Sequence, residues 1–280
     1  MQKITLLFTA LFVTVLFQVH AQINMPAPSP QSTVSQKVGL TDISITYSRP
    51  GVKGRKIFGG LETYGEIWRT GANALTKLTL SDEVTLGGQK VPAGEYALLT
   101  IPDKAEWTII INSNPQGSTA DYDESQDVAR FTVKPNTLPE KVETFTINFS
   151  EIKNESANID LEWENTRVRI PLEVAIDDKV MAQIEKTMAN PQASAGDYFQ
   201  AASYYMTTDR DPKQALEWIN KAVEMNDTQY WVVHLQAKIL EKNGKKAEAK
   251  AAAEKSMKLA QEAGNDDYVR LNKDLIAGLQ

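Results

Sequence analysis

Apolar and polar side chains alternate in short segments from residue 32 to about residue 174, and this alternation limits the fold of the first half more than any other feature of the sequence. A period of two puts apolar side chains on one face of a β-strand, as with Ile43, Ile45 and Tyr47 between polar neighbours. The same alternation recurs at 144–149 and at 167–174. The pattern predicts about ten short strands, and no pattern of helical length lies between them.

The short connections between these segments decide how the strands pair. Parallel strands need long crossover connections, which are usually helical, so strands this close in sequence form mostly antiparallel sheets. Residues 32–175 are therefore predicted to form a mainly β domain, an antiparallel sandwich or a jelly-roll-like double sheet. Two tight hairpins are expected, at Gly87-Gly88 and at Glu164-Asn165. The second would bring Glu162 and Arg167 into a cross-strand ion pair.

The second half has the pattern of an α-helical region. A connecting helix is expected at 176–190, capped by Asp177. Beyond it, residues 191–280 contain a repeat in which Ala215, Ile219 and Ala222 recur 34 residues later as Ala249, Ala253 and Ser256. Small residues at these positions allow paired helices to approach closely, and the spacing resembles that of tetratricopeptide repeats. An unrelated helical bundle is the alternative.

The N-terminal segment has the parts of a secretory signal. Lys3 precedes the apolar run 4–19, and Val19-His20-Ala21 fits a cleavage site before Gln22. Residues 1–21 are therefore predicted to be a signal peptide, followed by a Pro-rich leader at 22–31, and the protein is expected to be periplasmic or secreted. An uncleaved membrane anchor is the alternative, although a spanning helix needs about 20 apolar residues. No membrane span is expected after cleavage.

Charge and composition exclude several classes of function. The formal net charge is −6, whereas a general nucleic-acid binder needs surplus Lys and Arg, so no nucleic-acid partner is expected. The sequence has no Cys and two His, of which His20 lies in the predicted signal. The remaining residue, His234, would have to be the His of any Ser-His-Asp catalytic triad. A metal site with several His ligands cannot form within one chain. We expect no cofactor and no metal, and a helix-packing or surface role for His234.

Carboxylate chemistry is not excluded. The acidic stretch 121–127 spaces its carboxylates like a calcium loop, but Gln126 stands where the sharp turn needs Gly, and Thr132 stands where the bidentate Glu should be. An EF-hand is therefore rejected. A solvated loop is the preferred interpretation, and a looser calcium site is the alternative. A glycosidase would need two carboxyl groups that face each other across a cleft.

Positive charge and aromatic side chains gather in the Gly-rich segment 47–73 of this otherwise acidic chain. Guanidinium groups bind carboxylates or phosphates in a bidentate manner, and aromatic faces stack on sugars or guanidinium groups. The segment therefore predicts a pocket for an anionic or sugar-like ligand. The candidate binding residues are Arg49, Arg55, Tyr64, Trp68, Arg69 and Asn73. The alternative is structural: the three Arg side chains would pair with Glu62, Glu66 or backbone carbonyls and hold an irregular loop in place.

Several strings in the first half resemble one known family. They lie at 47–51, 54–59, 68–73, 92–96 and 107–108, and the string Trp68-Arg69-Thr70-Gly71-Ala72-Asn73 is specific. Over residues 32–174 they resemble the domain of unknown function 2911, which occurs in exported proteins of Bacteroidetes-type bacteria. The resemblance implies a β-rich domain, often with a repeat-containing tail. It implies no activity, substrate or catalytic residue.

The scarcity of catalytic side chains and the helical repeat together favour an exported, non-catalytic ligand- or protein-binding module of the bacterial cell envelope. A protein partner is expected to bind through residues 190–280, and an anionic or sugar-like ligand through the loop. Two alternatives stay open at this point. One is a carboxylate-dependent envelope hydrolase acting on glycans, which would make the protein an enzyme, and the other is a structural assembly factor.

Overall fold

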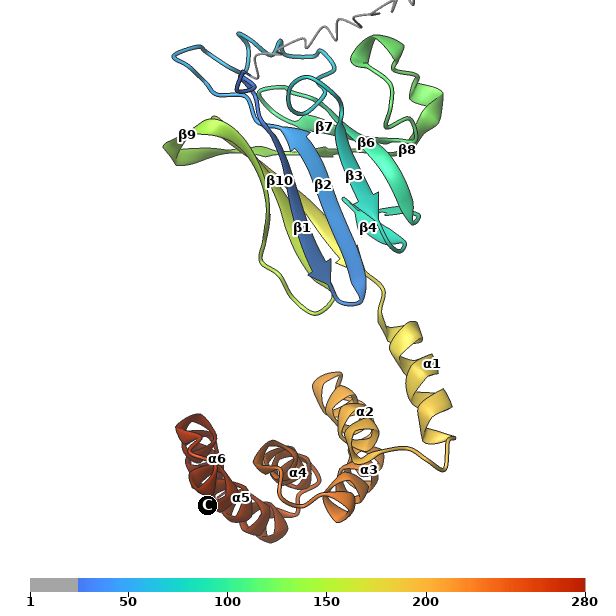
Figure 1. Ribbon diagram of the computed structural model, residues 1–280, viewed down its shortest axis with the longest axis vertical. Coiled ribbons are helices and arrows are strands. Elements are labelled where there is room, and N and C mark those ends of the chain that lie inside the picture. Colours follow the sequence, from blue (N-terminus) through green and yellow to red (C-terminus); the bar gives the residue numbers. More distant parts are fainter. Residues whose placement is uncertain (1–24, 280) are drawn as a thin grey trace, which may run out of the picture. The chain divides into compact units, whose positions relative to one another are not determined.

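The computed structural model describes residues 25–279, and the predicted signal peptide lies outside them. The chain divides into two compact units between Val174 and Ala175 (Figure 1). The first unit consists of β-strands and the second of α-helices, which confirms the predicted fold class. Among residues 25–279, no helix is both long and apolar enough to cross a membrane.

Antiparallel strands form two sheets in the first unit. The strands are β1 (Gln31–Val38), β2 (Thr41–Ser48), β3 (Thr76–Leu80), β4 (Val84–Leu86), β5 (Gln89–Val91), β6 (Gly94–Ile101), β7 (Trp107–Asn112), β8 (Asp127–Val133), β9 (Pro135–Ser150) and β10 (Ser156–Val174). One sheet has the order β1-β2-β3-β6-β7-β8, and the other has the order β5-β4-β10-β9. Each pair of neighbouring strands is antiparallel, as predicted.

Aromatic rings fill the space between the two sheets. The ring of Trp68 lies 5.1 Å from that of Phe145 in β9 and 5.8 Å from that of Trp163 in β10, between centroids. Phe58 and Trp107 join this aromatic cluster. Burying one such side chain removes about 150–250 Å² from water, which contributes about 4–6 kcal/mol. This gain exceeds the cost of about 1–3 kcal/mol for Trp163 Nε1, which is buried without a partner among the described residues.

A side chain from the four-stranded sheet covers part of an edge of the six-stranded sheet. Gln89 in β5 donates from Nε2 to the carbonyl oxygen of Arg130 in β8 (2.7 Å) and accepts at Oε1 from the Arg130 N–H (3.0 Å). The amide group thereby takes the place of a neighbouring strand at one residue of β8. Because unpaired edge groups invite pairing with other chains, this contact both joins the sheets and protects the edge.

The two predicted hairpins have different outcomes. Strands β4 and β5 pair across Gly87-Gly88, as predicted. At Glu164-Asn165 the prediction is wrong, because β10 continues through both residues as one strand. The register of β10 with β9 shifts twice around Glu164, and Glu164 has a φ of 55°. This irregularity in a continuing strand interrupts the alternation of apolar and polar residues at the place where we expected a turn. Arg167 and Glu162 do form an ion pair, but within a single strand.

Six helices form the second unit: α1 (Asp177–Met188), α2 (Ala195–Thr207), α3 (Pro212–Met225), α4 (Tyr230–Lys242), α5 (Lys246–Glu262) and α6 (Asp266–Gly278). Local sequence signals set where they begin. Ser194 and Asp197 form a capping box at the start of α2. Asp211 caps α3, and Pro212 occupies its first turn.

Asp177 has a different role from the predicted one. Helix α1 begins after Ile176 without a side-chain cap, so the capping prediction is wrong. The Asp177 carboxylate instead accepts hydrogen bonds from Tyr204 Oη (2.6 Å) and from the Arg210 guanidinium. The hydrogen bond from Arg210 is the largest of the effects that lower the pKa of Asp177. The carboxylate therefore joins α1 to α2 and to the turn that follows α2.

Small residues fill the interior of the helix stack. Consecutive helices pack together, and α4 also touches α2 and α6, so α2, α4 and α6 form one layer, with α3 and α5 in the other (Figure 1). Ala202, Ala237 and Asn272, which follow each other at intervals of 35 residues, are fully buried on α2, α4 and α6. The buried small residues of α5 include Ala249, Ala253 and Ser256. The close approach of the helices depends on these side chains.

A buried hydrogen-bond network joins three helices of the stack. His234 Nδ1 on α4 lies 2.8 Å from Asn272 Oδ1 on α6. Asn272 Nδ2 donates to Ser256 Oγ and to the carbonyl of Tyr268. Because both amide protons of Asn272 are used, its Oδ1 accepts, and the neutral His234 ring carries its proton on Nδ1. Burial is the main cause that lowers the pKa of His234, Lys238 adds to the lowering, and the Asn272 hydrogen bond opposes it.

His234→Gln should make the stability of the helical unit less dependent on pH. Because the pKa of His234 is lower in the folded chain than its unfolded value of about 6.5, the unfolded chain takes up the proton first, and stability is lost as the pH falls below that value. Urea unfolding, followed by far-ultraviolet circular dichroism, should show a larger loss for the wild-type chain than for the variant between neutral pH and about pH 5.5. Equal losses would contradict this assignment.

Gly87→Ala should destabilise the β domain more than Gly88→Ala. Both glycines have positive φ, so each substitution carries a backbone cost of about 1–2 kcal/mol. A Cβ on Gly87 would also lie 2.2 Å from the Phe131 ring, whereas a Cβ on Gly88 would meet open space. We expect the free energy of unfolding of the Gly87→Ala variant to be lower by about 1 kcal/mol or more than that of the matched control. Equal values in urea unfolding would show that the Phe131 ring moves freely.

Candidate functional site

The segment between β2 and β3 is irregular, and Trp68 fixes it to the body of the domain. The Trp68 backbone exchanges hydrogen bonds with Thr100 in β6, at 2.7 and 3.0 Å. Its buried indole donates from Nε1 to the Gly71 carbonyl (3.0 Å). The Thr70 side chain, also buried, contacts the Thr100 hydroxyl at 3.1 Å. The string 68–73 is thus a structural element that turns the chain from the aromatic cluster back towards β3.

The three candidate Arg side chains donate mainly to backbone carbonyls. Arg49 donates from Nε to the Phe145 carbonyl (3.1 Å) and from Nη2 to Thr146 Oγ1 (2.8 Å), which links the end of β2 to β9. Arg55 donates to two carbonyls of its own loop, those of Val52 (3.1 Å) and Gly51 (2.7 Å). These contacts hold the irregular loop by hydrogen bonds that strands would otherwise provide.

Arg69 and Asn73 belong to the same turn. Arg69 is half-buried and donates to the Asn73 carbonyl, while Asn73 Nδ2 donates to the Ser29 carbonyl (3.2 Å) and to Ser48 Oγ (3.3 Å). Burial raises the pKa of Glu62, and the charges of Arg69 and Arg55 partly offset this rise. Within the described part of the chain, however, neither Arg forms an ion pair with that carboxylate.

Tyr64 lies apart from the Arg side chains, at a hollow of about 150 Å³. We call it the Tyr64 hollow, and its lining residues are Phe58, Tyr64, Asp103, Lys104, Trp107, Pro135, Asn136, Thr137 and Thr166. The Lys104 ammonium lies 5.9 Å from the centroid of the Tyr64 ring. The ring also lies close to Gly59, where a Cβ would come within 2.4 Å of it. The hollow therefore combines aromatic rings with hydrogen-bonding side chains.

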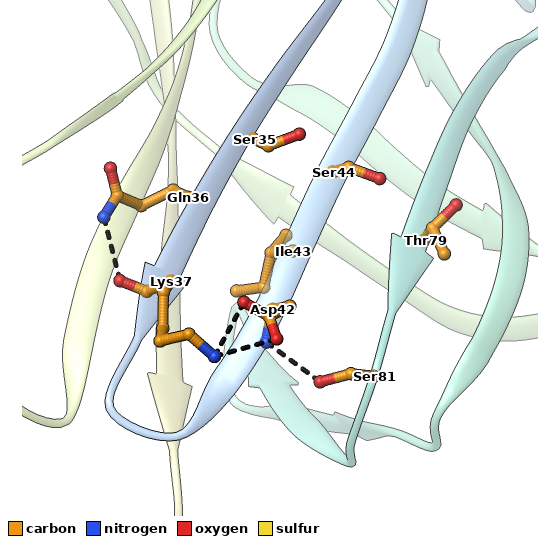
Figure 2. Close-up of a pocket in the computed structure, with 8 residues that line it drawn as sticks. All are labelled: Ser35, Gln36, Lys37, Asp42, Ile43, Ser44, Thr79 and Ser81. Carbon is orange, nitrogen blue, oxygen red and sulfur yellow. Dashed lines mark hydrogen bonds and ion pairs between the residues drawn. The ribbon is translucent and has the colours of Figure 1, made fainter.

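A second hollow, of about 290 Å³, lies at the β1–β2 hairpin and is called the sheet hollow (Figure 2). It is lined by Ser35, Gln36, Lys37, Asp42, Ile43, Ser44, Thr79 and Ser81. Ser35, Ser44 and Thr79 follow one another in register across three strands. At its end, Lys37 pairs with Asp42 (2.8 Å), whose backbone N–H donates to Ser81 Oγ (2.9 Å). Its charged groups are thus already bound to each other.

The acidic stretch 121–127 is tied down by its own hydrogen bonds. Asp127 accepts from Asn112 Nδ2 (2.8 Å), Tyr122 Oη (2.7 Å) and Arg130 Nη1 (3.1 Å). Burial, together with the hydrogen bond to Asp127, raises the pKa of Tyr122 to about 12. Between residues 25 and 279 there is no group of three His, Cys, Asp or Glu side chains that could hold a metal ion. The Asp127 carboxylate is therefore already hydrogen-bonded to neighbouring side chains.

Sequence reasoning missed most of the Tyr64 hollow. Of its lining residues, only Tyr64 was a candidate. Asp103 and Lys104 come from the turn between β6 and β7, Thr137 from β9 and Thr166 from β10. The strand register makes Thr137 and Thr166 direct neighbours although they are far apart in sequence. No local motif joins these residues, so only the pairing of β9 with β10 could have indicated them.

Arg49→Ala should destabilise the β domain, whereas Arg55→Ala should have little effect. Removing Arg49 breaks hydrogen bonds between β2 and β9 and leaves the Phe145 carbonyl without its guanidinium donor, at a cost of about 1–3 kcal/mol. Arg55 is exposed and bonded only within its own loop, so its removal should cost less than about 1 kcal/mol. Urea unfolding monitored by Trp fluorescence measures both, and a reversed order would contradict the structural role of Arg49.

Comparison with known proteins places the first unit in a family. The chain resembles the solution structure of protein BPP2914 from Bordetella parapertussis, with 20% identity, a TM-score of 0.32 and coverage of 36% of this chain and 86% of the other. No curated protein matches the chain. The model of a family described as a protein of unknown function (DUF2911) matches residues 29–172, which is just over half of the 280 residues. The chain belongs to this DUF2911 family.

Proposed function

We propose that the protein is an exported, non-catalytic binding module of the bacterial cell envelope, in which the helical unit holds a partner protein and the β domain holds a small ligand. The observation that carries the proposal is the two-layered stack of α2 to α6, with small buried residues at fixed intervals. Stacked helix pairs of the tetratricopeptide type present extended surfaces on which partner proteins bind. We therefore assign residues 191–280 to this type of repeat.

An exposed indole on α4 supports a protein partner. Trp231 is 37% exposed, whereas Trp218, the other Trp of the helical unit, is buried. The Trp231 ring lies 4.9 Å from the Tyr230 ring, between centroids, and this contact holds the indole at the surface. Trp is enriched among the few residues that supply most of the binding energy at protein interfaces. Trp231 is therefore the residue through which we expect the partner to bind.

The ligand part of the proposal concerns the loop of the β domain. The candidate residues are Arg49, Arg55, Tyr64, Trp68, Arg69 and Asn73. Among them Arg55 is exposed, so it is the guanidinium best able to reach an anionic ligand. Tyr64 borders a hollow, which suits a sugar-like ligand.

We also propose the predicted division of the chain into segments, and its predicted cellular location. The division is a signal peptide at 1–21, a leader at 22–31, a β domain at 32–175, a connecting helix at 176–190 and the helical repeat region at 191–280. The source would be a Bacteroidetes-type bacterium and the location periplasmic or secreted. The family match over residues 29–172 supports the limits of the β domain.

Trp231→Ala should weaken capture of the partner protein at least tenfold, because loss of an interface Trp commonly costs about 2 kcal/mol or more. The full chain and the variant would be used as bait in a periplasmic extract, and the captured protein would be identified and titrated in purified form. Met225→Ala is the matched control, since Met225 is exposed at the end of α3. Equal affinity of all three proteins, or no reproducible partner, would overturn the proposed binding role of the helical unit.

A further inference from the structure

The Tyr64 hollow has a floor of buried aromatic rings and walls of polar side chains. Phe58 and Trp107 are both part of the aromatic cluster between the sheets and also line the hollow. Tyr64 is half-buried, and its ring lies close to Gly59 and near the Lys104 ammonium. The floor is fixed by the core of the domain, so the hollow is largely formed before a ligand arrives, as is usual for small-molecule sites.

The hydrogen-bonding groups of the walls are unused. Among the described residues, the Tyr64 hydroxyl and the side chains of Asn136, Thr137 and Thr166 make no hydrogen bond to the protein. The Asp103 carboxylate accepts hydrogen bonds only at Oδ1, from backbone N–H groups of its own turn. The sheet hollow differs in that its charged groups bind each other (Figure 2) and none of its described lining residues is aromatic. Since Thr137 and Thr166 are cross-strand neighbours, two hydroxyls with free donors and acceptors stand side by side.

Charge and size restrict the ligand. The lining contains one carboxylate and one ammonium group, Asp103 and Lys104, so it has no net charge that would favour an anion. A volume of about 150 Å³ is smaller than the roughly 300–1,000 Å³ of pockets for drug-sized molecules, and it suits one small ring. A pyranose has hydroxyl groups around its edge for polar walls and an apolar C–H face for an aromatic ring.

We propose that the Tyr64 hollow binds a single pyranose residue of a neutral glycan. This inference rests on the proposed ligand-binding role of the β domain and selects the sugar from the two ligand classes. The sugar packs its C–H face on the Tyr64 ring, and its hydroxyls bond to Thr137, Thr166 and Asn136. Its binding changes the surroundings of the Trp107 indole, which lines the hollow.

The test titrates the full mature chain with cellobiose, maltose and N,N′-diacetylchitobiose, by calorimetry and by Trp fluorescence. We expect saturable binding of at least one disaccharide in the millimolar range. Tyr64→Ala should weaken this binding at least tenfold, and Thr137→Val should weaken it about three- to tenfold, the value of one hydrogen bond. The matched control is Thr79→Val in the sheet hollow, which should bind as the wild-type chain does.

Thr137→Val keeps the inference testable if Tyr64→Ala unfolds the loop. Absence of saturable binding of all three disaccharides, or equal weakening by Thr79→Val, would overturn the inference. Binding of inorganic phosphate that is lost in Arg55→Ala and kept in Thr137→Val, with no sugar binding, would also overturn it but would leave the β domain a ligand-binding module. Capture of the partner protein depends on Trp231, so its outcome is independent of this test.

Discussion

The burial of Trp68 between the two sheets is the interaction on which the rest of the β domain depends. The loop from β2 to β3 has few strand-like hydrogen bonds, so its position comes from what it buries. Trp68 stacks on Trp163 and bonds through its backbone to Thr100, and so it fixes the middle of the loop against both sheets. Arg49 then holds its start to β9. Hydrophobic burial here is several times larger than any single hydrogen bond, so the indole determines where the guanidinium groups can reach.

The same constraint produces the hollow beside the loop. With Phe58 held in the aromatic cluster, the chain from Gly59 onward returns towards the β6–β7 turn, and the absence of a side chain at Gly59 leaves room for the Tyr64 ring. The ring therefore lines a space that is also lined by paired residues of β9 and β10. Because the polar side chains of that pairing are not consumed by the fold, they are available to a ligand. In the proposed binding role, structure and recognition would use different residues of one loop: Trp68 and Arg49 hold it, and Tyr64 lines the hollow.

The strands and helices could be predicted from sequence to the extent that periodicity determines them. Alternation around Ile45 identified β2, and the repeat of Ala215 as Ala249 identified the helical unit. The error at Glu164 has a physical cause, since a bulge and a turn both interrupt the alternation with polar residues, and only the pairing with β9 distinguishes them. The candidate site was predicted from local density of Arg and aromatic residues. That criterion found Tyr64, but it could not find Thr137, which reaches the hollow only through long-range strand pairing.

One of the three equivalent buried positions on α2, α4 and α6 of the helical unit is polar. Ala202 on α2 and Ala237 on α4 are buried apolar residues, whereas the equivalent buried position on α6 is Asn272. A buried amide is costly unless its donors and acceptor are all bonded, and here they are, to Tyr268, Ser256 and His234. Small apolar residues would allow α6 to slide along α4 and α5, because apolar contacts have no direction. The directional bonds of Asn272 allow one position only, so α6 is fixed by hydrogen-bond geometry where α2 and α4 are fixed by packing.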